Sequence, residues 1–455
     1  MNELVLRIGG AGLTVLAYAA MCLAIWVRQR RRHAADARAA AALAGDGAQS
    51  PMLVVFASQT GQAEAIAWQT GRALHAQGTP VRVLSLNALD AAALHCAERA
   101  LFVASTYGEG DAPDGASVFA EQLMGTPDAL PALPSLRYAV LALGDRQYAQ
   151  FCGFGRALDA WLQSTGAVPM APRIEVDNAD ADALAEWHAQ WGGSGEEAAG
   201  AAPAVVPWRL VARERLNPGS EGGPVFHLGL KPPPGTALDW QSGDLVQVAL
   251  SADPARPRDY SIASIPADGE LQLVVRQERH PDGTLGAASG LLTSTLSLGD
   301  SVAMRLRPHR NFRLEDNAER PLILIGNGTG LAGLRGHLRA RAATGRHENW
   351  LLFGERRAAH DFLYRTELEA WQASGVLRRL DMVFSRDQAE RAYVQHRLLQ
   401  LGDEVHAWLA RGAAVYVCGS LQGMAGGVDA ALRQVAGDAT VRDLIASGRY
   451  RRDVY

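Results

Sequence analysis

The chain has 455 residues, enough for about three domains that each bury a core of their own. Hydrophobic residues make up 48% of the chain and charged residues 20%, which indicates a folded globular protein rather than a disordered one. Its four cysteines form no CxxC pair and its twelve histidines no HExxH motif. This argues against a disulfide scaffold, a cysteine-ligated cluster, a zinc ribbon and a zincin-type site. Any redox chemistry must therefore use a bound organic cofactor.

The net charge of −4 is unevenly distributed along the chain. Residues 51–197 carry seven arginines and seventeen acidic residues, whereas residues 198–455 carry thirty-one basic and twenty-eight acidic residues. An acidic module beside a mildly basic one predicts docking through complementary fields, or steering of a basic partner. The alternative is that the acidic residues only keep the surface soluble.

Residues 8–27 form an uncharged, mostly apolar run, about 30 Å long as a helix and therefore long enough to span a bilayer. A cluster of arginines follows the run at residues 28–32, whereas a cleaved signal peptide carries its basic residues before the apolar run. By the positive-inside rule, this order predicts a single-pass helix in the cell inner membrane, with the catalytic domains in the cytoplasm. The alternative is a buried core helix. Residues 34–50, which are rich in alanine, are predicted to be a tether.

The first predicted module begins with a strand at residues 52–57 that leads into a polar turn and then a helical pattern. Such a turn presents backbone N–H groups and the helix dipole to a phosphate, and hydroxyl side chains add donors. No lysine follows the glycine of the turn, which argues against a Walker-type nucleotide loop. The sequence predicts a phosphate-monoester site, with an ordinary capped turn as the alternative, made of Ser58, Gln59, Thr60, Gly61, Gln62 and Ala63.

Two further predicted strands, at residues 101–105 and 139–143, also end in loops that carry aromatic side chains. Loops that leave the carboxyl ends of parallel strands converge on one crevice. Tyr107 and Tyr148 are therefore predicted to cover the two faces of a flat heteroaromatic ring, although either tyrosine alone would more often fill a core or a surface. The residues predicted to line the crevice are Ser105, Thr106, Tyr107, Gly108, Glu109, Gly110, Leu143, Gly144, Asp145, Tyr148, Phe151 and Cys152.

These three loops resemble those of flavodoxin, and more closely those of the flavodoxin-like module of diflavin reductases. SQTGQAE is similar to the FMN phosphate loop of that family, STYGEGD to its flavin-ring loop and LGDRQYAQFCGFG to its third loop. The resemblance covers residues 51–192 and implies a flavodoxin-like α/β domain that binds FMN. It also implies that Asp177, within EVDNADAD, lies near the flavin.

The second predicted module follows a linker rich in small residues. Short alternating stretches such as residues 245–250 and 271–275, separated by proline and glycine turns, predict an all-β module, either a sandwich or a small barrel. Within it, Arg258 offers a guanidinium for a phosphate, Tyr260 a ring for a flavin face and Ser261 a hydroxyl for the edge of the ring. Each of these features alone is equally compatible with ordinary surface chemistry.

The third predicted module begins with a buried-strand run at residues 321–325 that leads into the turn GNGTG. Further strand candidates with helical stretches between them predict a doubly wound α/β domain. Arginine and tyrosine side chains in residues 385–395 suit a ribose 2′-phosphate and an adenine ring, which favours NADPH over NADH. A salt-bridged surface is the alternative for any single arginine. The predicted coenzyme-binding residues are Gly328, Thr329, Ser385, Arg386, Arg391, Ala392, Tyr393, Val394 and Gln395.

From residue 208 to the end, the motifs RDYSIAS, GAAS, NFRL, GNGTG, FSRD, YVCG and RYRRDVY are similar to those of the ferredoxin–NADP reductase half of diflavin reductases. The sulfite reductase flavoprotein component and the NADPH–cytochrome reductases are the relatives that they resemble most. This resemblance implies that Ser261, Cys418 and Asp453 position the nicotinamide for hydride transfer, and that Tyr455 shields the FAD ring. The residues that it assigns to FAD are Arg258, Asp259, Tyr260, Ser261, Gly286, Ala287, Ala288 and Ser289.

The expected fold is therefore multidomain, with four parts in chain order. These are a transmembrane helix (8–27), a flavodoxin-like FMN-binding α/β domain (51–192), a FAD-binding antiparallel β-barrel (206–315) and a ferredoxin-reductase-type NADP-binding α/β domain (320–455).

The sequence also departs from the family pattern in a few places. Gly333 stands where the family usually has proline, and Gly426-Gly427 replaces a Lys-Asp pair that helps to hold the coenzyme. The family inserts a helical connecting domain before RxYS, whereas only about 15 residues separate Gly243 from Arg258, too few for a domain.

The resemblance implies an NADPH-dependent oxidoreductase that passes electrons from NADPH to FAD, then to FMN and then to a one-electron acceptor such as a haem protein or another metal centre. The alternatives are a flavoprotein subunit of a sulfite reductase-type complex and a ferric-chelate reductase. The expected partner is a redox acceptor protein or a metal chelate, placed at the membrane by the predicted anchor. No bound metal and no nucleic-acid partner is expected.

Overall fold

The protein is described here by a computed structural model, which covers residue 43 and residues 50–59, 61–108, 110–126, 131–146, 148–178, 180–191, 205–250 and 253–455. The predicted membrane segment, residues 8–27, lies outside these ranges. No helix within them has the length and apolar character that a membrane crossing requires. Leu43, in the segment predicted to be a tether, is instead buried in the core of the first module, because its apolar side chain packs there.

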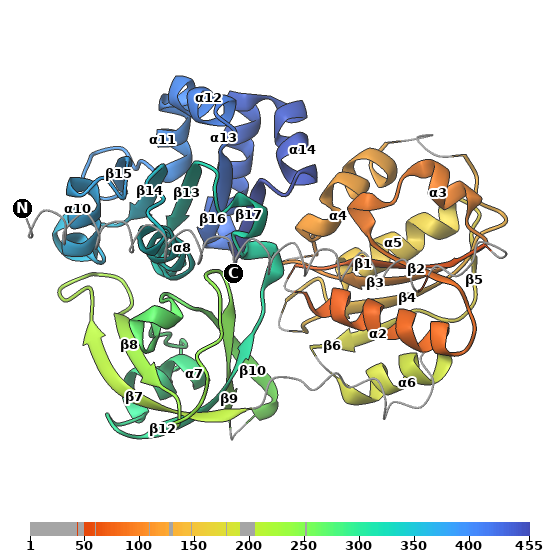
Figure 1. The fold of residues 1–455 in the computed structure, drawn as a ribbon, viewed down its shortest axis with the longest axis horizontal. Helices are drawn as coiled ribbons and strands as arrows, with labels where there is room; N and C mark the ends of the chain where they lie inside the picture. The colour runs from red at the N-terminus through yellow and green to blue at the C-terminus, as the bar shows by residue number, and fades with distance from the viewer. Residues whose placement is uncertain are drawn as a thin grey trace, which may run out of the picture.

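The first module is built on a parallel sheet in the order β2-β1-β3-β4-β5, with β6 paired to β4. Helices cover both faces, so its central strands are continuous apolar runs, as expected for a parallel sheet. Figure 1 shows α2 and α6 on one face and α3, α4 and α5 on the other. The elements are β1 (Met52–Ala57), α2 (Gln62–Ala76), β2 (Val81–Ser85), η1 (Leu86–Ala88), α3 (Ala91–Cys96), β3 (Arg99–Ser105), α4 (Asp114–Phe119), η2 (Ala120–Met124), β4 (Arg137–Gly144), α5 (Gly153–Ser164), β5 (Val168–Pro169), β6 (Ile174–Asp177) and α6 (Ala181–Trp191).

The second module is an antiparallel sheet in the order β10-β9-β12-β7-β8-β11. Ile262, next to β10, forms an antiparallel bridge with Leu273 of β11, so the two ends of the sheet approach each other. Alternate side chains point inward to a common core that includes Trp208 and Trp240. The elements are β7 (Val206–Arg215), β8 (Val225–Lys231), β9 (Leu245–Leu250), β10 (Asp253–Ser261), η3 (Pro266–Asp268), β11 (Leu271–Arg276), α7 (Ala287–Gly290), η4 (Leu291–Thr295), β12 (Ser301–Arg307), η5 (Arg310–Phe312) and η6 (Glu315–Asn317).

The third module is a second parallel sheet, in the order β15-β14-β13-β16-β17, with helices on both faces. Its last strand, β17, pairs with β16 and is an edge strand of the sheet. The elements are β13 (Leu322–Asn327), η7 (Gly328–Gly330), α8 (Leu331–Ala343), β14 (Asn349–Glu355), α9 (Ala358–Asp361), α10 (Arg365–Ala373), β15 (Arg379–Phe384), α11 (Val394–Gln400), α12 (Gly402–Ala410), β16 (Ala414–Gly419), η8 (Leu421–Ala425), α13 (Gly426–Ala436), α14 (Asp438–Ala446) and β17 (Tyr450–Val454).

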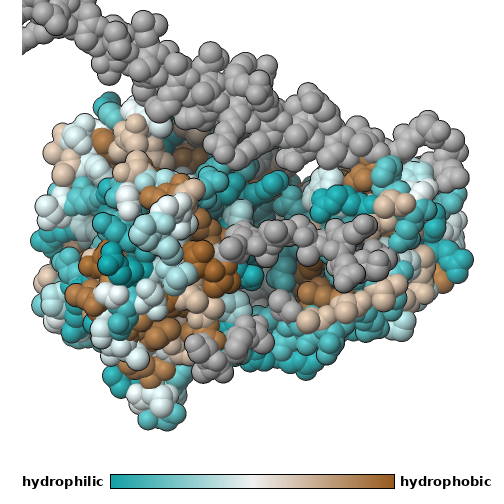
Figure 2. All heavy atoms as spheres, turned by 60° about the horizontal axis from the view of Figure 1, so that its bottom comes forward, coloured by the Kyte–Doolittle hydropathy of each residue, from teal (hydrophilic) through white to brown (hydrophobic). Residues whose placement is uncertain are grey.

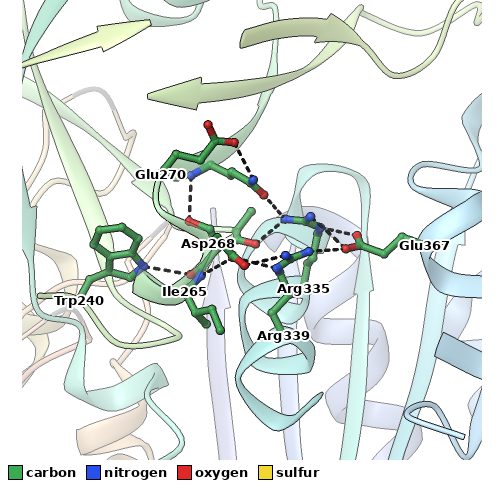
Figure 3. Close-up of polar contacts among 10 residues, drawn as sticks. Trp240, Ile265, Asp268, Glu270, Arg335, Arg339 and Glu367 are labelled. Atoms are coloured by element: carbon green, nitrogen blue, oxygen red, sulfur yellow. Dashed lines mark hydrogen bonds and ion pairs between the residues drawn. The ribbon is translucent and has the colours of Figure 1, made fainter. Parts of the chain in front are cut away.

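A buried ion-pair network joins the second and third modules (Figure 3). Arg335, on α8, donates to the carbonyl oxygen of Ala263 at 2.7 Å and to the Glu367 carboxylate at 2.6 Å. Arg339, one turn along the same helix, pairs with Asp268 of η3 and with Glu367, both at 2.6 Å. Because Arg335 is 5% exposed, its charge is compensated by these contacts rather than by water. The network fixes the position of α8 against the second module.

The C-terminus lies in the middle of the molecule, where the three modules meet (Figure 1). On the face that Figure 2 shows, apolar residues are scattered among hydrophilic ones, as is usual for a protein whose apolar residues fill its cores.

Candidate functional site

A cavity of about 1470 Å³ lies at the carboxyl ends of the third-module strands, against the second module. Loops at this edge of a parallel sheet are the usual place for a nucleotide. One residue of the first module, Tyr148, also reaches the cavity. The predicted site residues that line it are Tyr148, Arg258, Asp259, Tyr260, Ser261, Ser289, Gly328, Thr329, Ser385, Arg386, Arg391, Ala392, Tyr393, Val394, Gln395, Asp453 and Tyr455.

Ser261, Cys418 and Asp453 lie in contact at the meeting point of the second and third modules. The Ser261 hydroxyl donates to Asp453 Oδ2 at 2.7 Å, and Cys418 Sγ lies 3.7 Å from the same oxygen. Cys418 and Asp453 are register partners on β16 and β17, while Ser261 ends β10. Burial, and then the charge of Asp453, raises the pKa of the Cys418 thiol well above its usual range. The thiol therefore stays neutral, and the carboxylate faces two neutral donors.

Glycines behind this centre permit the close approach of its parts. A Cβ atom at Gly330 would lie 2.1 Å from the carbonyl oxygen of Cys418. At Gly333, where a proline was expected from the family pattern, a Cβ atom would lie 3.0 Å from Phe312 Cε1 and 3.3 Å from Cys418 Sγ. The Phe312 ring thus packs against the helix at the position of the missing side chain.

The predicted coenzyme residues come from the end of β15 and the start of α11. Arg386 pairs with Glu221 of the β7–β8 loop at 2.9 Å, so the loop of the second module approaches this part of the cavity. The Tyr393 ring is 40% exposed and can offer a face to a base. Gln395 Oε1 is buried and has no hydrogen-bond partner among the described residues. The arginines suit a phosphate, and the unsatisfied amide oxygen can accept from a hydroxyl or amino group of a nucleotide.

The predicted phosphate loop follows β1 and turns at Gly61, whose φ of +87° is readily adopted only by glycine. The Gly61 N–H donates to Ser58 Oγ at 2.9 Å, and α2 begins at the next residue. Gln62 Nε2 donates to the carbonyl oxygen of Asn178 at 3.1 Å, which ties the loop to the end of β6. The result is a strand, a glycine turn and a helix start, the geometry that binds a phosphate. Thr60 lies outside the described residues.

The two tyrosines predicted to cover a ring have different surroundings. Tyr148 is 42% exposed and lines the cavity. Tyr107 is 9% exposed, packs in the core of the third module and donates its hydroxyl to the carbonyl oxygen of Val454 at 3.1 Å. Burial raises the pKa of the Tyr107 phenol far above its usual range, so the hydroxyl keeps its proton. Tyr107 thus joins the first module to the last strand of the chain.

Side chains of the first module bind the outer edge of β17. The carbonyl oxygen of Val454 accepts from Tyr107, and that of Arg452, two residues earlier, accepts from Gln59 Nε2 at 2.9 Å. Backbone carbonyl groups two residues apart on a strand point to the same edge of that strand. Because β16 pairs with one edge of β17, these two carbonyls point outward from the opposite edge. The Arg452 guanidinium also pairs with Asp114 at the start of α4, with Nε 2.8 Å from Oδ1. None of these contacts was predicted from the sequence.

Three more ion pairs cross between the first module and the other two. Asp177, at the end of β6, lies 3.3 Å from Arg256 of β10. Glu121 of η2 lies 3.6 Å from both Arg433 and Arg442, on α13 and α14. Each pair sets an acid of the first module against an arginine of the rest of the chain, in agreement with the predicted complementary fields.

Comparisons with known proteins agree with this arrangement. A family model for flavodoxin matches residues 54–191, and one for the oxidoreductase NAD-binding domain matches residues 324–430. The chain is also similar to proteins named sulfite reductase (NADPH) flavoprotein alpha-component. The one from Aliivibrio fischeri (strain ATCC 700601 / ES114) is 30% identical over 92% of this chain and 91% of its own length. The one from Vibrio cholerae serotype O1 (strain ATCC 39315 / El Tor Inaba N16961) is 29% identical over 90% of this chain and 88% of its own length. The one from Bacillus subtilis (strain 168) is 28% identical over 88% of this chain and 89% of its own length.

The chain belongs to the diflavin reductase family. As a diflavin reductase it is an NADPH-dependent oxidoreductase whose cofactors are FMN, FAD and NADPH, with electrons passing from NADPH through FAD to FMN. The alignment with the B. subtilis relative covers 539 positions, more than the 455 residues of this chain, so the relatives carry residues with no counterpart here. At the place where the family pattern has a connecting domain, and where the short spacing predicted none in this chain, β9 and β10 form an antiparallel hairpin with only residues 251–252 between them.

The predicted location of this diflavin reductase is wrong. Relatives that cover about nine tenths of the chain are, by name, flavoprotein components of sulfite reductase, and this comparison gives no support to a single-pass protein of the inner membrane. Residues 8–27 lie outside the part of the chain that the structure describes. A membrane-bound acceptor is likewise unsupported.

The residues of this diflavin reductase fit the groups that the family requires. In the predicted flavin-ring loop, Thr106 Oγ1 is buried without a partner among the described residues, as Gln395 Oε1 is at the predicted coenzyme site. Gly328, in the GNGTG turn, has a φ of +58°, and a Cβ atom there would lie 3.0 Å from Arg276 Nη2. Unsatisfied acceptors and donors beside arginines and a glycine turn are what a dinucleotide needs.

Other predicted residues of the first module shape the loops without lining the cavity. Cys152 is fully buried with φ +54° ahead of α5, and its thiol donates to the carbonyl oxygen of Ala142 at 3.3 Å. The Phe151 ring is covered by the Arg146 guanidinium at 4.5 Å. A Cβ atom at Gly108 would lie 2.3 Å from Leu421 Cδ2, which marks another close contact with the third module. Five more of the predicted residues lie at the ends of strands or helices, namely Ala63, Ser105, Leu143, Gly144 and Asp177. Gly110 and Asp145 lie in loops, and Glu109 is outside the described residues.

In the second module, Gly286, Ala287 and Ala288 belong to the start of α7 and do not line the cavity, although Ser289 does. The Ser289 hydroxyl accepts the N–H of Glu278 at 3.1 Å, which places α7 against the strand end after β11. Sequence reasoning missed Arg276 and Glu355, which line the cavity and lie 4.0 Å apart. Arg276 stands outside the motifs that resemble the family, whereas Glu355 belongs to the similar stretch GERRAAHDFLY, to which no site role was assigned.

We expect Gly427→Ala to raise the KM for NADPH several-fold without changing kcat. A Cβ atom at Gly427 would lie 2.9 Å from Gln395 Cδ and Nε2, so the methyl group must displace this flexible amide from the coenzyme site. Steady-state kinetics with ferricyanide measures both constants. Gly426→Ala is the matched control, because a Cβ atom at Gly426 meets nothing within 4 Å. Equal KM values in the two variants would contradict this role of Gly427.

Glu355 gives the stability of the chain a pH dependence with a definite sign. Burial raises the pKa of its carboxyl to about 7, against the attraction of Arg276. The folded chain therefore holds a proton that the unfolded chain has released between about pH 4.5 and 7, so this group lowers stability as pH rises through that window. Glu355→Gln should stabilise the chain relative to the parent, and we expect this gain in the free energy of unfolding to be about 2 kcal/mol larger at pH 8 than at pH 5. Urea unfolding of both proteins at the two pH values measures it. If the substitution changed the free energy of unfolding by the same amount at both pH values, Glu355 would not be the group behind the pH dependence.

Proposed function

We propose that this diflavin reductase is the electron-supplying component of a sulfite reductase-type system, delivering single electrons from NADPH to a separate haem or other metal centre. The single observation that carries the proposal is that side chains of all three modules line or adjoin one cavity. The names of the relatives, which describe a flavoprotein component of sulfite reductase, support the choice of acceptor. Reduction of a ferric chelate is the weaker alternative, because nothing in the described site favours a chelate.

The proposal divides the site among three groups. The turn of Ser58, Gly61 and Gln62 would hold the phosphate of FMN, and Tyr148 would cover its ring. The second module would hold FAD through Arg258, Tyr260 and Ser289, with Tyr455 over the ring. The coenzyme would lie against Ser385, Arg386, Arg391, Tyr393 and Gln395. When bound, the nicotinamide and flavin rings supply the hydride and electron chemistry.

The chain's own residues would orient these rings and control the charge around them. Asp453, with Ser261 and Cys418 as neutral donors, places one negative charge where positive charge develops on a nicotinamide. Its partners are largely shielded from bulk water, because Cys418 is fully buried and Ser261 is 8% exposed. The role of Cys418 is electrostatic, because its thiol stays protonated.

The test is to purify the chain, load it with FMN and FAD, and add NADPH without oxygen. We expect one FMN and one FAD per chain, reduction of both flavins, and reduction of cytochrome c and ferricyanide. Adding a haem-containing sulfite reductase component and sulfite should then produce sulfide. Reduction of the two dyes without any sulfide would refute the proposed acceptor and leave the reductase activity in place. Absence of flavin reduction would refute the site itself.

A further inference from the structure

Glu221 stands at the edge of the cavity, on the loop between β7 and β8. Gly223, two residues further along the loop, lines the cavity, and so does Arg386, with which Glu221 pairs. Arg386 Nη1 donates to Glu221 Oε2 at 2.9 Å, and Arg357 Nη2 lies 3.4 Å from Glu221 Oε1. One carboxylate of the second module therefore bridges two arginines of the third, and one of these arginines belongs to the proposed coenzyme site.

A close ion pair is the exception among the arginines that line the cavity. In the described part of the chain these arginines are Arg258, Arg276, Arg279, Arg356, Arg386 and Arg391. Two of them pair with a described carboxylate, Arg386 with Glu221 at 2.9 Å and Arg276 with Glu355 at 4.0 Å. The others form no ion pair with a described residue, which suits a site for an anionic coenzyme. Glu221 thus offsets positive charge at one particular position of the cavity.

The loop that carries Glu221 is held in place at its base and at its side. Asn217, which is 2% exposed, accepts the N–H of Val225 at 2.8 Å and so closes the base of the loop. His360 Nδ1, on α9 of the third module, lies 3.0 Å from the carbonyl oxygen of Pro218. These contacts place the Glu221 carboxylate against the third module as part of a defined loop.

NADH and NADPH differ at the adenine ribose, where NADH has a 2′-hydroxyl and NADPH a 2′-phosphate. In dinucleotide sites a carboxylate accepts the 2′-hydroxyl, whereas an arginine accommodates the 2′-phosphate. Here both groups stand together, because Glu221 takes one donor of Arg386 and leaves the rest of the guanidinium for a phosphate. A phosphate on Arg386 would then lie beside the carboxylate, and the two anions repel each other.

No other described acid shares this position with Glu221. Asp387, the residue after Arg386, turns its carboxylate to the N–H of Ala358, at 2.8 Å, and pairs with neither arginine. Two guanidinium charges and one carboxylate charge leave one net positive charge at the cluster of Arg357, Arg386 and Glu221. Removing the carboxylate would double that charge without touching either arginine.

We propose that Glu221 is a specificity-determining residue for the coenzyme: its carboxylate weakens binding of the 2′-phosphate of NADPH and accepts the 2′-hydroxyl of NADH, which narrows the preference for NADPH. This inference rests on the proposed placement of the coenzyme against Arg386. The Glu221 side chain is 58% exposed, so water screens its charge, and we expect each of the two effects to be about threefold.

Calorimetric titration of the flavin-loaded chain with NADP⁺ and with NAD⁺ measures the preference without any electron acceptor. Glu221→Gln removes the charge and keeps a neutral acceptor, so NADP⁺ should bind about threefold more tightly and NAD⁺ nearly as in the parent. Glu221→Ala also removes the acceptor, so we expect the same gain for NADP⁺ and an about threefold loss for NAD⁺. Steady-state kinetics with ferricyanide should show these changes in the KM values for NADPH and NADH, with kcat unchanged.

Glu348→Gln is the matched control. Glu348 precedes β14, at the amino end of its sheet and away from the cavity, and pairs with Arg411 at 2.7 Å. Its side chain is 46% exposed, similar to that of Glu221. The variant removes the same charge from the chain, and we expect both affinities to stay at the parent values.

Arg386→Gln tests the placement on which the inference rests. We expect it to weaken NADP⁺ about tenfold and to leave NAD⁺ nearly unchanged, because only the 2′-phosphate needs the guanidinium. Unchanged NADP⁺ binding would refute the placement of the coenzyme and the inference with it. If Arg386→Gln weakens NADP⁺ while both Glu221 variants keep the parent ratio of the two affinities, the placement stands and the role of Glu221 is refuted. An equal gain for NADP⁺ in Glu348→Gln would also refute that role, because net charge alone would then explain the gain.

Discussion

Replacing Asp453 with alanine is expected to lower NADPH-dependent reduction of ferricyanide about 100-fold, the size of effect seen when one preorganised electrostatic group is removed from a reacting centre. Asp453 is 8% exposed and provides the one carboxylate that Ser261 and Cys418 both face. Its removal leaves two neutral groups beside the proposed nicotinamide site. Stopped-flow measurement of flavin reduction by NADPH would show whether the loss lies in this first step.

Two variants separate the charge of Asp453 from its shape. Asp453→Asn keeps the side-chain volume and a hydrogen-bond acceptor for Ser261 but removes the charge, so it should lose nearly as much rate as the alanine variant. Ser261→Ala keeps the charge and should lose about tenfold, because it removes one hydrogen bond to a carboxylate. If Asp453→Asn reduced its flavin at the parent rate, the charge would have no role in hydride transfer.

Replacing Arg335 with methionine is expected to destabilise the chain by about 2 to 3 kcal/mol, because the carbonyl oxygen of Ala263 and the Gln272 amide lose a charged donor, while Glu367 keeps its pair with Arg339. Arg335 bonds to Glu367, to the carbonyl oxygen of Ala263 and to Gln272 across the boundary between the second and third modules. Methionine keeps most of the side-chain volume, so lost packing contributes little. Urea unfolding of the flavin-loaded chain, followed by tryptophan fluorescence, measures the effect.

Arg411→Met is the matched control for this prediction. Arg411 pairs with Glu348 at 2.7 Å, but both side chains are about half exposed, at 48% and 46%. Solvated pairs of this kind contribute roughly 0 to 1 kcal/mol. Similar losses in the two variants would mean that the network at Arg335 is no more important than an ordinary surface pair.

Most of the fold was predictable because its strands are short buried runs closed by turns. Residues 52–57 and 245–250 were predicted as strands, and they are β1 and β9 with the same bounds. Strands without a clear pattern were not predicted: β5 has two exposed residues, and β2 alternates with an exposed arginine. The choice between a sandwich and a small barrel depends on the bridge from Ile262 to Leu273, a long-range contact that no local pattern shows.

For the site, motifs located the residues but not their neighbours. Ser261, Cys418 and Asp453, separated by up to 192 positions, do meet, because each stands near a strand end whose place the fold determines. The role of Tyr107 was not predictable, because its ring stands in a flavin-loop motif while its hydroxyl binds the last strand. His309 and Asn311 were missed for the same reason. His309 Nε2 and Asn311 Nδ2 lie 3.1 and 2.9 Å from the carbonyl oxygen of Gln59, which is 250 and 252 residues away, and backbone acceptors leave no trace in the sequence.

The contacts on β17 have a consequence for handling the protein in pieces. Open strand edges readily pair with other chains and lead to aggregation. Here the outward carbonyls of Arg452 and Val454 are covered by Gln59 and Tyr107, so the first module acts as a cap for the rest of the chain. A fragment that begins after the first module would expose this edge to solvent. Expressed alone, it should self-associate more than the whole chain does, which size-exclusion chromatography of the two proteins would show.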